Sequence, residues 1–275
     1  MKQAMILAAG LGTRLKPLTD TMPKALVPVG GKPLLDIQID KLQQAGYDRF
    51  VVNVHHFAQQ IVDHVNDRKE KILISDETSE LLETGGGLKK AQGLFRDDEP
   101  ILIHNVDILD NVDYEWFRRQ HQDDEDAVLL VSRRKTKRYL LFDSAMRLMG
   151  WKNIETGEVK SPFPWLREAE ITIDDNLQVT LHTYSSFSSG EGRGEVSPLH
   201  SSLYAFAFSG IHSFSPRLFP LMDRFPDRFP IIDFYLSVCH RSRIVGLVKN
   251  DLKVLDVGKL DSLEQAEQFV QVRTP

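Results

Sequence analysis

Short apolar runs and stretches with helical spacing alternate along the first half of the chain. Residues 4–9 are apolar throughout, as expected of a fully buried strand in an α/β sheet. Residues 34–45 instead carry apolar side chains at positions 35, 39 and 42, which predicts a helix that ends before Gly46. The same reasoning predicts strands at residues 50–54, 72–74, 101–103 and 127–131, and a helix through Ile61, Val62 and Val65. Strands separated by helices predict a largely parallel sheet with right-handed crossovers.

The alternation loosens between residues 139 and 202. Short strands are expected at residues 171–173 and 179–182, and the stretch 185–194, rich in glycine and serine, is expected to be a flexible loop. Beyond it we expect a strand at 204–211 and helices near 215–222, 231–240 and 260–270. The pattern therefore predicts a single α/β domain over residues 1–275, with a β-rich insertion at 139–202.

Composition excludes several classes of protein. The chain has 275 residues, 41% of them hydrophobic and 27% charged, which is ordinary for a globular protein. A net charge of −5 does not favour nonspecific nucleic-acid binding, and no apolar run approaches the roughly 20 residues of a membrane span. The lone cysteine, Cys239, cannot form an internal disulfide, so we expect a cytoplasmic protein. The sequence leaves open whether the protein forms a homo-oligomer.

A glycine turn with two nearby cations follows the first predicted strand. Gly10 and Gly12 permit positive φ and let backbone N–H groups approach a ligand closely. Arg14 adds a planar fork and Lys24 a mobile point charge, and both kinds of cation bind phosphate oxygens. The stretch therefore predicts a polyphosphate site.

Two common phosphate loops do not fit. A dinucleotide fingerprint requires a third glycine where Leu15 stands, and Pro17 and Pro23 prevent a long helix from starting there. The pair Gly31-Lys32 is followed by Pro33, whereas a P-loop requires serine or threonine at that position.

The glycine turn resembles the nucleotidyltransferase family that makes nucleoside-diphosphate sugars from a nucleoside triphosphate and a sugar 1-phosphate. The matching residues are 7–14 (LAAGLGTR), 17–19 (PLT) and 23–29 (PKALVPV), and the resemblance covers roughly residues 3–133 and 204–270. It implies a Rossmann-like, mostly parallel mixed sheet sandwiched by helices. It also implies that Arg14 and Lys24 serve catalysis and that the nucleotide is bound by Leu7, Ala9, Gly10, Gly12 and Thr13.

Two aspartates are candidates for a metal site. Asp107 follows the predicted strand 101–103 and Asp256 follows a short apolar run, and ligands of open α/β sheets gather at the carboxyl ends of strands. Mg²⁺ prefers one or two carboxylates, completed by water and substrate phosphates. The resembled family has its metal carboxylates in corresponding motifs, although Val106 here replaces the commoner glycine. The resemblance thus implies Mg²⁺ as cofactor, bound by Asp107 and Asp256.

A second glycine cluster lies at residues 80–88. Three glycines at a helix start leave free N–H groups and a positive dipole end, which suit a phosphate, a ribose or a base edge, although an ordinary helix start has the same pattern. A similar family segment contacts the nucleotide. The resemblance implies the same role for Glu80, Thr84, Gly85 and Gly86.

The sugar side rests on the resemblance alone. A family lysine that holds the sugar phosphate corresponds most nearly to Lys152, although the spacing is short by a residue or two. The segment 208–212 (FSGIH) matches a family strand that borders the sugar pocket, and it suggests that Ser209 and Gly210 leave room for the sugar.

These features predict an enzyme that transfers a nucleotidyl group to a sugar 1-phosphate and releases pyrophosphate. The resembled branch favours uridylyl or guanylyl transfer, with N-acetylmuramate-1-phosphate uridylyltransferases as the nearest type and mannose- or heptose-1-phosphate guanylyltransferases close behind. Two other classes remain open: a catalytically silent sensor of sugar nucleotides, and a nicotinamide-dependent oxidoreductase. Leu15 disfavours the oxidoreductase, as does Asn53, because an acidic residue would end the second strand of a dinucleotide fold.

Overall fold

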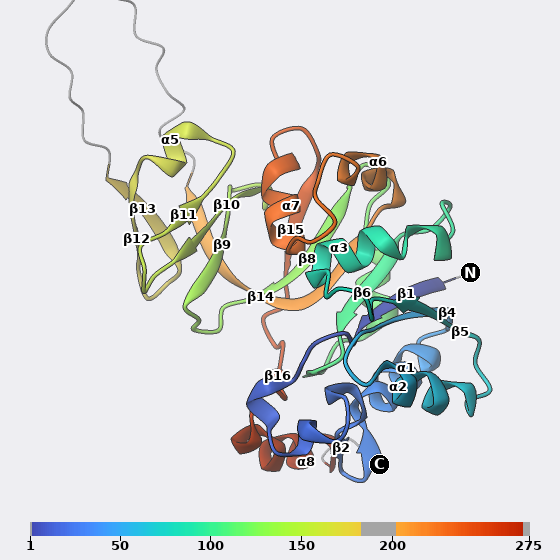
Figure 1. The fold of residues 1–275 in the computed structure, drawn as a ribbon. Helices are drawn as coiled ribbons and strands as arrows, with labels where there is room; N and C mark the ends of the chain where they lie inside the picture. Colours follow the sequence, from blue (N-terminus) through green and yellow to red (C-terminus); the bar gives the residue numbers. More distant parts are fainter. Residues whose placement is uncertain (1, 183–201, 272–275) are drawn as a thin grey trace, which may run out of the picture.

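The structure is a computed structural model that describes residues 2–182 and 202–271, and a mixed sheet runs through its centre (Figure 1). Its strand order is β5–β4–β1–β6–β14–β8–β15. The first four of these strands are mutually parallel, as are β8 and β15, whereas β14 is antiparallel to both of its neighbours β6 and β8. The prediction of a mostly parallel mixed sheet is confirmed. The strands are β1 (Lys2–Leu7), β4 (Tyr47–Val54), β5 (Ile72–Asp76), β6 (Ile101–Asn105), β8 (Ala127–Ser132), β14 (Leu203–Phe214) and β15 (Ile244–Val248).

Helices cover both faces of this sheet. Side chains alternate between the faces of a strand, so Ala4 and Ile6 of β1 join one hydrophobic cluster and Met5 joins the other. The first cluster contains residues of α1 (Leu34–Gln44), α2 (Ala58–Asn66), α4 (Tyr114–Arg119) and α8 (Leu263–Gln271). The second contains residues of α3 (Glu83–Lys90), α6 (Phe219–Met222) and α7 (Ile231–Val238). The unbroken apolar run of β1 thus follows from burial on both sides.

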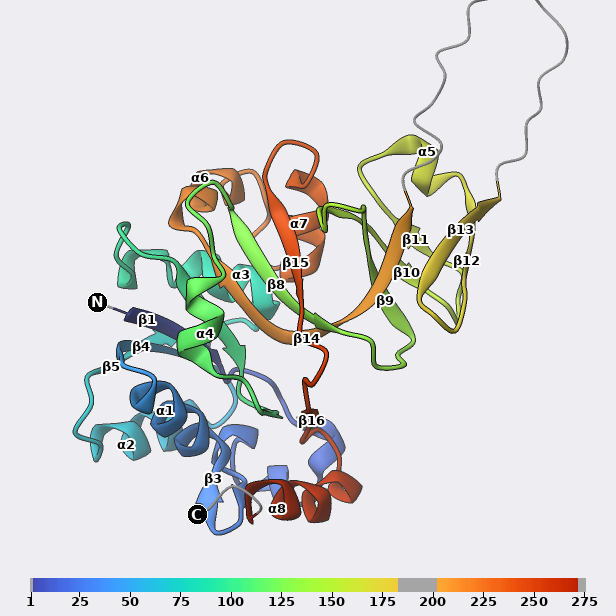
Figure 2. The same cartoon turned by 180° about the vertical axis from the view of Figure 1, so that it is seen from behind.

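Strand β14 joins the central sheet to the insertion. Residues 207–214 pair with β8 and, over the last four, with β6, whereas residues 203–206 pair with β9 and β13 (Figure 2). The register with β8 shifts between Phe208 and His212, where the strand bends. The described part of the insertion consists of β9 (Arg138–Phe142), β10 (Leu148–Asn153), β11 (Val159–Lys160), α5 (Pro164–Arg167), β12 (Glu170–Ile173) and β13 (Gln178–His182). The loop expected at 185–194 lies outside the described residues.

Two small strand pairs complete the described chain. β2 (Pro28–Val29) pairs with β3 (Lys32–Pro33), and β7 (Ile108–Asp110) pairs with β16 (Val254–Asp256). The sequence pattern did not predict β7 and β16, because both strands are short. Single 3₁₀ turns occur at Thr13–Leu15, Leu18–Asp20, Lys24–Leu26, Gln92–Leu94, Pro216–Leu218 and Leu260–Ser262. Within the described residues, we find no helix with the length and apolar character needed to cross a membrane.

Candidate functional site

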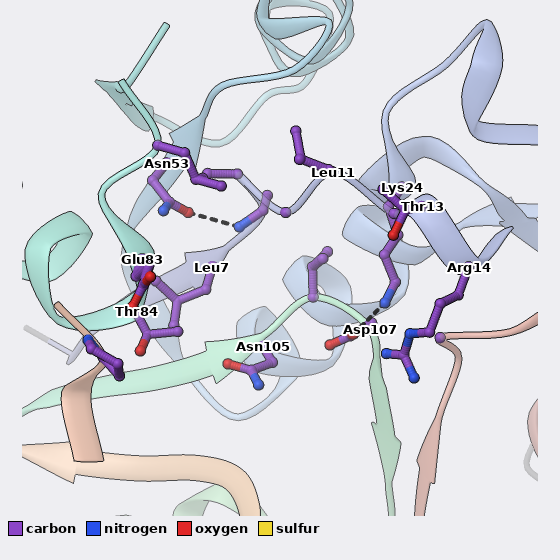
Figure 3. Close-up of a pocket in the computed structure, with 18 residues that line it drawn as sticks. Leu7, Leu11, Thr13, Arg14, Lys24, Asn53, Glu83, Thr84, Asn105 and Asp107 are labelled. Atoms are coloured by element: carbon purple, nitrogen blue, oxygen red, sulfur yellow. Dashed lines mark hydrogen bonds and ion pairs between the residues drawn. The ribbon is translucent and has the colours of Figure 1, made fainter. Parts of the chain in front are cut away.

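A cleft of about 560 Å³ lies at the carboxyl ends of β1, β4 and β6 (Figure 3). Ligands of open α/β sheets bind at this edge, and the volume is in the range of small-molecule sites. The cleft is lined by Leu7, Ala8, Ala9, Gly10, Leu11, Gly12, Thr13, Arg14, Lys24, Asn53, Leu81, Glu83, Thr84, Asn105, Val106, Asp107, Pro230 and Gly258. The predicted residues of the glycine turn, Lys24, Thr84 and Asp107 therefore share one cavity.

The glycine turn folds back on itself after β1. Gly12 has φ +64°, and its carbonyl accepts hydrogen bonds from the Leu15 amide at 2.8 Å and the Thr19 hydroxyl at 2.9 Å. A Cβ at Gly12 would lie only 2.9 Å from Thr19 Cγ2, so both the conformation and the packing require glycine. A Cβ at Gly10 would instead meet open space, and its φ is not positive, which corrects the expectation for that residue. Gly10 therefore lines the cleft without adding a side chain to it.

Asn53 ties the glycine turn to the neighbouring strand. Its side-chain oxygen accepts a hydrogen bond from the Ala8 amide at 2.7 Å, and its side-chain nitrogen donates to Glu77 at 2.7 Å. Glu77 is fully buried and also accepts a hydrogen bond from the Leu82 amide at 3.1 Å. Burial raises the pKa of Glu77, although the bonds from Asn53 and Leu82 oppose that shift. This network, which the sequence did not reveal, connects both walls of the cleft.

Lys24 and Asp107 form an ion pair at one end of the cleft. The Lys24 side chain is only 9% exposed and the Asp107 side chain 21% exposed. Asp107 lies in the turn after β6. The start of this turn is fixed by a 3.1 Å hydrogen bond from the Val106 amide to the Leu7 carbonyl. The pair thus places one cation and one carboxylate next to the glycine turn.

A buried network beneath this turn holds it in place. Asp110 of β7 accepts hydrogen bonds from the Tyr114 hydroxyl and the Val112 amide, both at 2.7 Å, and its carboxylate lies 3.2 Å from a ring nitrogen of His104. Burial alone would raise the pKa of Asp110, but His104 and the charge of Lys41 hold it well below its usual range. Asp110 is therefore a structural neighbour of Asp107, outside the cleft lining.

Asp256 comes beside Asp107 through the short strand β16. Val257 donates its amide to the Asp107 carbonyl at 2.8 Å, and Asp256 is the register partner of Ile108. Asp256 lies 3.9 Å from the Arg14 guanidinium, and both side chains are more than half exposed. A Cβ at Gly258 would lie 2.6 Å from the Asp256 carboxylate and 2.7 Å from Arg14, so glycine lets these groups meet. Asp256 lies at the rim, in a second depression that shares Arg14 and Gly258 with the cleft.

The second glycine cluster has a different role from the predicted one. The amides of Gly85 and Gly86 donate to the Phe229 carbonyl at 2.9 and 3.1 Å, so they are not free to bind a phosphate. A Cβ at Gly86 would overlap the Asp227 carbonyl oxygen. These glycines therefore let α3 pack against the segment before α7, and the proposed nucleotide contacts of Gly85 and Gly86 are corrected.

Some residues that precede Gly85 line the cleft, and others are exposed to solvent. Thr84 lines the cleft, and its hydroxyl accepts the Ile231 amide at 2.9 Å. Glu83, at φ +62°, also lines the cleft and lies 3.2 Å from Arg228. Glu80 is exposed and does not line the cleft, so Leu81 and Glu83 replace it as the cleft residues of this segment.

The structure places Lys152, which is predicted to bind the sugar phosphate, away from the cleft. Lys152 is buried, and its ammonium lies 3.4 Å from the Gly157 carbonyl, away from the cleft. Its strand neighbours Trp151 and Asn153 point the other way and line a separate depression. The match to the family motif is short by a residue or two, and a shift of one residue moves a side chain to the other face of a strand. Lys152 therefore lies on the wrong face to bind the sugar phosphate, and this prediction is corrected.

Ser209 and Gly210 form the bend of β14 and do not line the cleft. The Ser209 hydroxyl donates to the Leu130 carbonyl at 2.7 Å and is buried. A Cβ at Gly210, where φ is +80°, would lie 2.8 Å from the Asn105 side chain. Gly210 leaves room for the side chain of Asn105, a cleft residue, and Ser209 bonds to β8, so their predicted sugar contacts are corrected.

Comparisons with known proteins agree with this geometry. Residues 3–139 match the family model described as nucleotidyl transferase. An N-acetylmuramate alpha-1-phosphate uridylyltransferase of Caulobacter vibrioides is 49% identical over 113 residues, which are 39% of this chain and 46% of that protein. A mannose-1-phosphate guanyltransferase of Emericella nidulans is 35% identical over 135 residues, 46% of this chain and 37% of that protein. The chain spans about half the length of the curated uridylyltransferases it matches.

Solved structures share the whole fold at low identity. The crystal structure of HddC from Yersinia pseudotuberculosis complexed with GMP-PN has a TM-score of 0.60 and 23% identity, covering 98% of this chain and 99% of that chain. The inositol-1-phosphate CTP transferase from T. maritima has a TM-score of 0.69 and 13% identity, covering 99% and 96%. The matched segment, residues 3–139, contains the glycine turn, Lys24 and Asp107. Through that segment, the chain is similar to the nucleotidyl transferase family.

Proposed function

We propose that the protein joins a nucleoside triphosphate to a sugar 1-phosphate, giving a nucleoside-diphosphate sugar and pyrophosphate. One observation carries the proposal: Arg14, Lys24, Asp107 and Asp256 converge at one end of the glycine-lined cleft. Two cations and two carboxylates in and at the rim of this cleft suit phosphoryl chemistry. Relatives named as uridylyl and guanylyl transferases favour those two nucleotides.

The reaction needs no protein nucleophile. A phosphate oxygen of the sugar 1-phosphate attacks the α-phosphorus of the nucleotide, the bond from that phosphorus to the bridging oxygen breaks, and pyrophosphate leaves. Arg14 and the amides of the glycine turn are placed to bind the β- and γ-phosphates. Lys24 has three donors, and those not used by Asp107 can bind the α-phosphate or the incoming one. Positioning and electrostatics supply the catalysis.

The carboxylates fit a hard divalent cation such as Mg²⁺. Asp107 and Asp256 lie on two hydrogen-bonded segments, because the Val257 amide donates to the Asp107 carbonyl and Asp256 pairs with Ile108. Two carboxylates beside a phosphate site match the donor set that Mg²⁺ takes in such enzymes. When bound there, the cation would withdraw charge from the reacting phosphate.

The cysteine content fits a reducing compartment, because a single cysteine cannot form an internal disulfide. Cys239 is the only cysteine of the sequence, and burial raises the pKa of its thiol to about 12, so it is poorly reactive. We therefore place the activity in the cytoplasm.

The test is pyrophosphate release with UTP, GTP, CTP or dTTP and a panel of hexose 1-phosphates. We expect release only when nucleotide, acceptor and Mg²⁺ are all present. Asp107→Asn and Asp256→Asn should each lower kcat/KM by about 100-fold or more, the scale of one preorganised charge at a reacting centre. Asp98→Asn, at an exposed site outside the cleft, is the matched control. Full activity of Asp107→Asn would reject the site, and nucleotide binding without any turnover would identify a sensor instead.

A further inference from the structure

Both candidate metal carboxylates depend on one short strand, β7. Asp107 directly precedes this strand, at the end of the cleft shown in Figure 3. Asp256 is the register partner of Ile108, and the Val257 amide donates to the Asp107 carbonyl at 2.8 Å. A movement of β7 would therefore move both carboxylates relative to the rest of the cleft.

The two edges of β7 are held by different parts of the chain. Among the residues that the structure describes, β7 pairs only with β16, in a two-stranded sheet. Successive carbonyls of a strand point to opposite edges, and that of Asp107 faces β16. On the other edge, Gln38 donates to the Ile108 carbonyl at 2.6 Å, and Lys41 donates to the Asp110 carbonyl at 3.0 Å. Side chains of α1 thus take the place of a third strand.

Gln38 is an unusual residue for its position. It is 1% exposed and lies on the face of α1 that packs into the core. A carbonyl can only accept, so the amide nitrogen of Gln38 must face Ile108, and its side-chain oxygen cannot bind there. Among the described residues, this oxygen has no hydrogen-bond partner. The other buried residues on this face of α1 are all apolar: Leu34, Leu35, Ile39 and Leu42.

Folding stability does not account for a glutamine at this position. The side chain gains one hydrogen bond, but it also leaves one buried acceptor unpaired, and the free energies of these two effects are of similar size and opposite sign. A methionine of nearly the same length would fill the same space in the core. What only the glutamine supplies is a donor that reaches the backbone of β7.

We propose that Gln38 is a positioning residue for the divalent cation, because it holds the part of β7 from which both carboxylates are placed. The inference rests on the proposed function and deepens it, since it concerns the same cation site. Mg²⁺ requires near-ideal octahedral geometry, so a small displacement of its ligands weakens binding. Groups that orient metal ligands from behind commonly change metal affinity by about 10- to 100-fold.

The experiment measures Mn²⁺ binding by electron paramagnetic resonance, without nucleotide or acceptor. Gln38→Met removes the donor and the unpaired oxygen together. We expect the Kd for Mn²⁺ to rise by about 10-fold or more, and the thermal midpoint to stay within about 3 °C of the wild type. In the pyrophosphate assay, the Mg²⁺ concentration for half-maximal turnover should rise as well, and excess Mg²⁺ should restore kcat. Gln38→Leu repeats the measurements with a second apolar side chain.

Gln3→Met is the matched control, at a buried glutamine of β1 that does not line the cleft. The Gln3 side chain is paired at both ends. Its nitrogen donates to the carbonyls of Arg96 and Glu99 at 2.8 and 2.7 Å, and its oxygen accepts the Arg96 amide at 2.9 Å. We expect the opposite pattern for this variant, with a midpoint lower by about 5 °C or more and an unchanged Mn²⁺ affinity.

The outcomes separate this inference from the proposed function. Unchanged Mn²⁺ affinity in Gln38→Met would overturn the inference and leave nucleotidyl transfer intact. A midpoint that falls as far as that of Gln3→Met would also overturn it, because the amide would then serve folding. A wild type that binds Mn²⁺ no better than Asp107→Asn does would instead reject the cation site on which the proposed function depends.

Discussion

Charged residues of the cleft are held in two different ways. Lys24 and Asp107 pair at a nearly buried position, whereas Arg14 and Asp256 approach only to 3.9 Å with both side chains largely exposed. Exposed ion pairs contribute little to stability because water screens them and ordering two long side chains costs entropy. Arg14 is thus free to bind a ligand without being needed for folding.

Replacing Arg14 tests this separation. For Arg14→Ala we expect kcat/KM to fall by about 100-fold or more, and the free energy of unfolding to change by less than about 1 kcal/mol. Lys16→Ala, an exposed neighbour that pairs with Asp20, should change neither quantity appreciably. Enzyme kinetics and urea unfolding measure the two effects. A large loss of stability in Arg14→Ala would show that the residue is structural.

The buried carboxyl of Glu77 predicts a pH dependence of stability. Burial raises its pKa in the folded protein above the ordinary value of 4.5. Its contribution to stability is therefore fully present below pH 4.5 and is lost as pH rises through the folded-state pKa. Relative to Glu77→Gln, the wild type should lose unfolding free energy over that window and then level off. Urea unfolding of both proteins at a series of pH values measures the difference, and a wild type that gains unfolding free energy relative to Glu77→Gln as pH rises would contradict the prediction.

At the scale of elements, α3 is placed by its glycines. Gly85 and Gly86 face Phe229 and Asp227, and their amides donate to the Phe229 carbonyl. This close approach places Pro230 in the lining of the cleft. The glycine cluster therefore shapes the cleft through packing rather than through contact with a phosphate.

Gly86→Ala should disturb this contact. The added methyl group overlaps the Asp227 carbonyl, and overpacking of this kind costs about 1–3 kcal/mol of stability. Gly93→Ala is the matched control, because a Cβ there meets nothing within 4 Å and the change should be neutral or stabilising by up to about 1 kcal/mol. Thermal unfolding compares the two variants. Equal midpoints would show that the segment around Asp227 moves aside at little cost.

At the scale of the whole molecule, the insertion and the central sheet share a core. Met5 of β1 and Phe142 of β9 belong to the same buried cluster, which β14 carries from one sheet to the other. We therefore propose that residues 1–275 form one domain. Ligand binding in the cleft should therefore stabilise the whole domain.

Ligand-induced stabilisation tests the whole assembly. A nucleotide at about 100 times its Kd stabilises the folded state by roughly 2.7 kcal/mol, or about 5–10 °C for a domain of this size. We expect UTP or GTP with Mg²⁺ to raise the thermal midpoint by that amount, and Asp107→Asn to reduce the shift. NADH is the negative control. A shift with NADH and none with any nucleoside triphosphate would favour the oxidoreductase over the transferase.

Site residues that lie close together in the sequence could be predicted, whereas roles that depend on distant partners could not. Gly12, Thr13, Arg14 and Lys24 are predicted together because one continuous stretch of sequence carries them. Asn53 was missed as a functional residue because its role depends on a hydrogen bond to Ala8, 45 positions away. The sequence does not predict the role of Gly85 and Gly86 correctly. Free amides at a helix start can bind either a ligand or a neighbouring segment, and only the packing against Phe229 shows which.

The sequence alone determined the parallel core and the glycine turn with its two cations, because apolar runs, glycines and cations act locally or through simple periodicity. Tertiary structure decided what depends on distant pairing. The short strand β16 brings Asp256 beside Asp107. The register of β10 turns Trp151 and Asn153, but not Lys152, toward a depression separate from the cleft. A shift of one residue reverses the face of every side chain in a strand, and the pairing of β10 with β9 and β11 decides which face each of its residues takes.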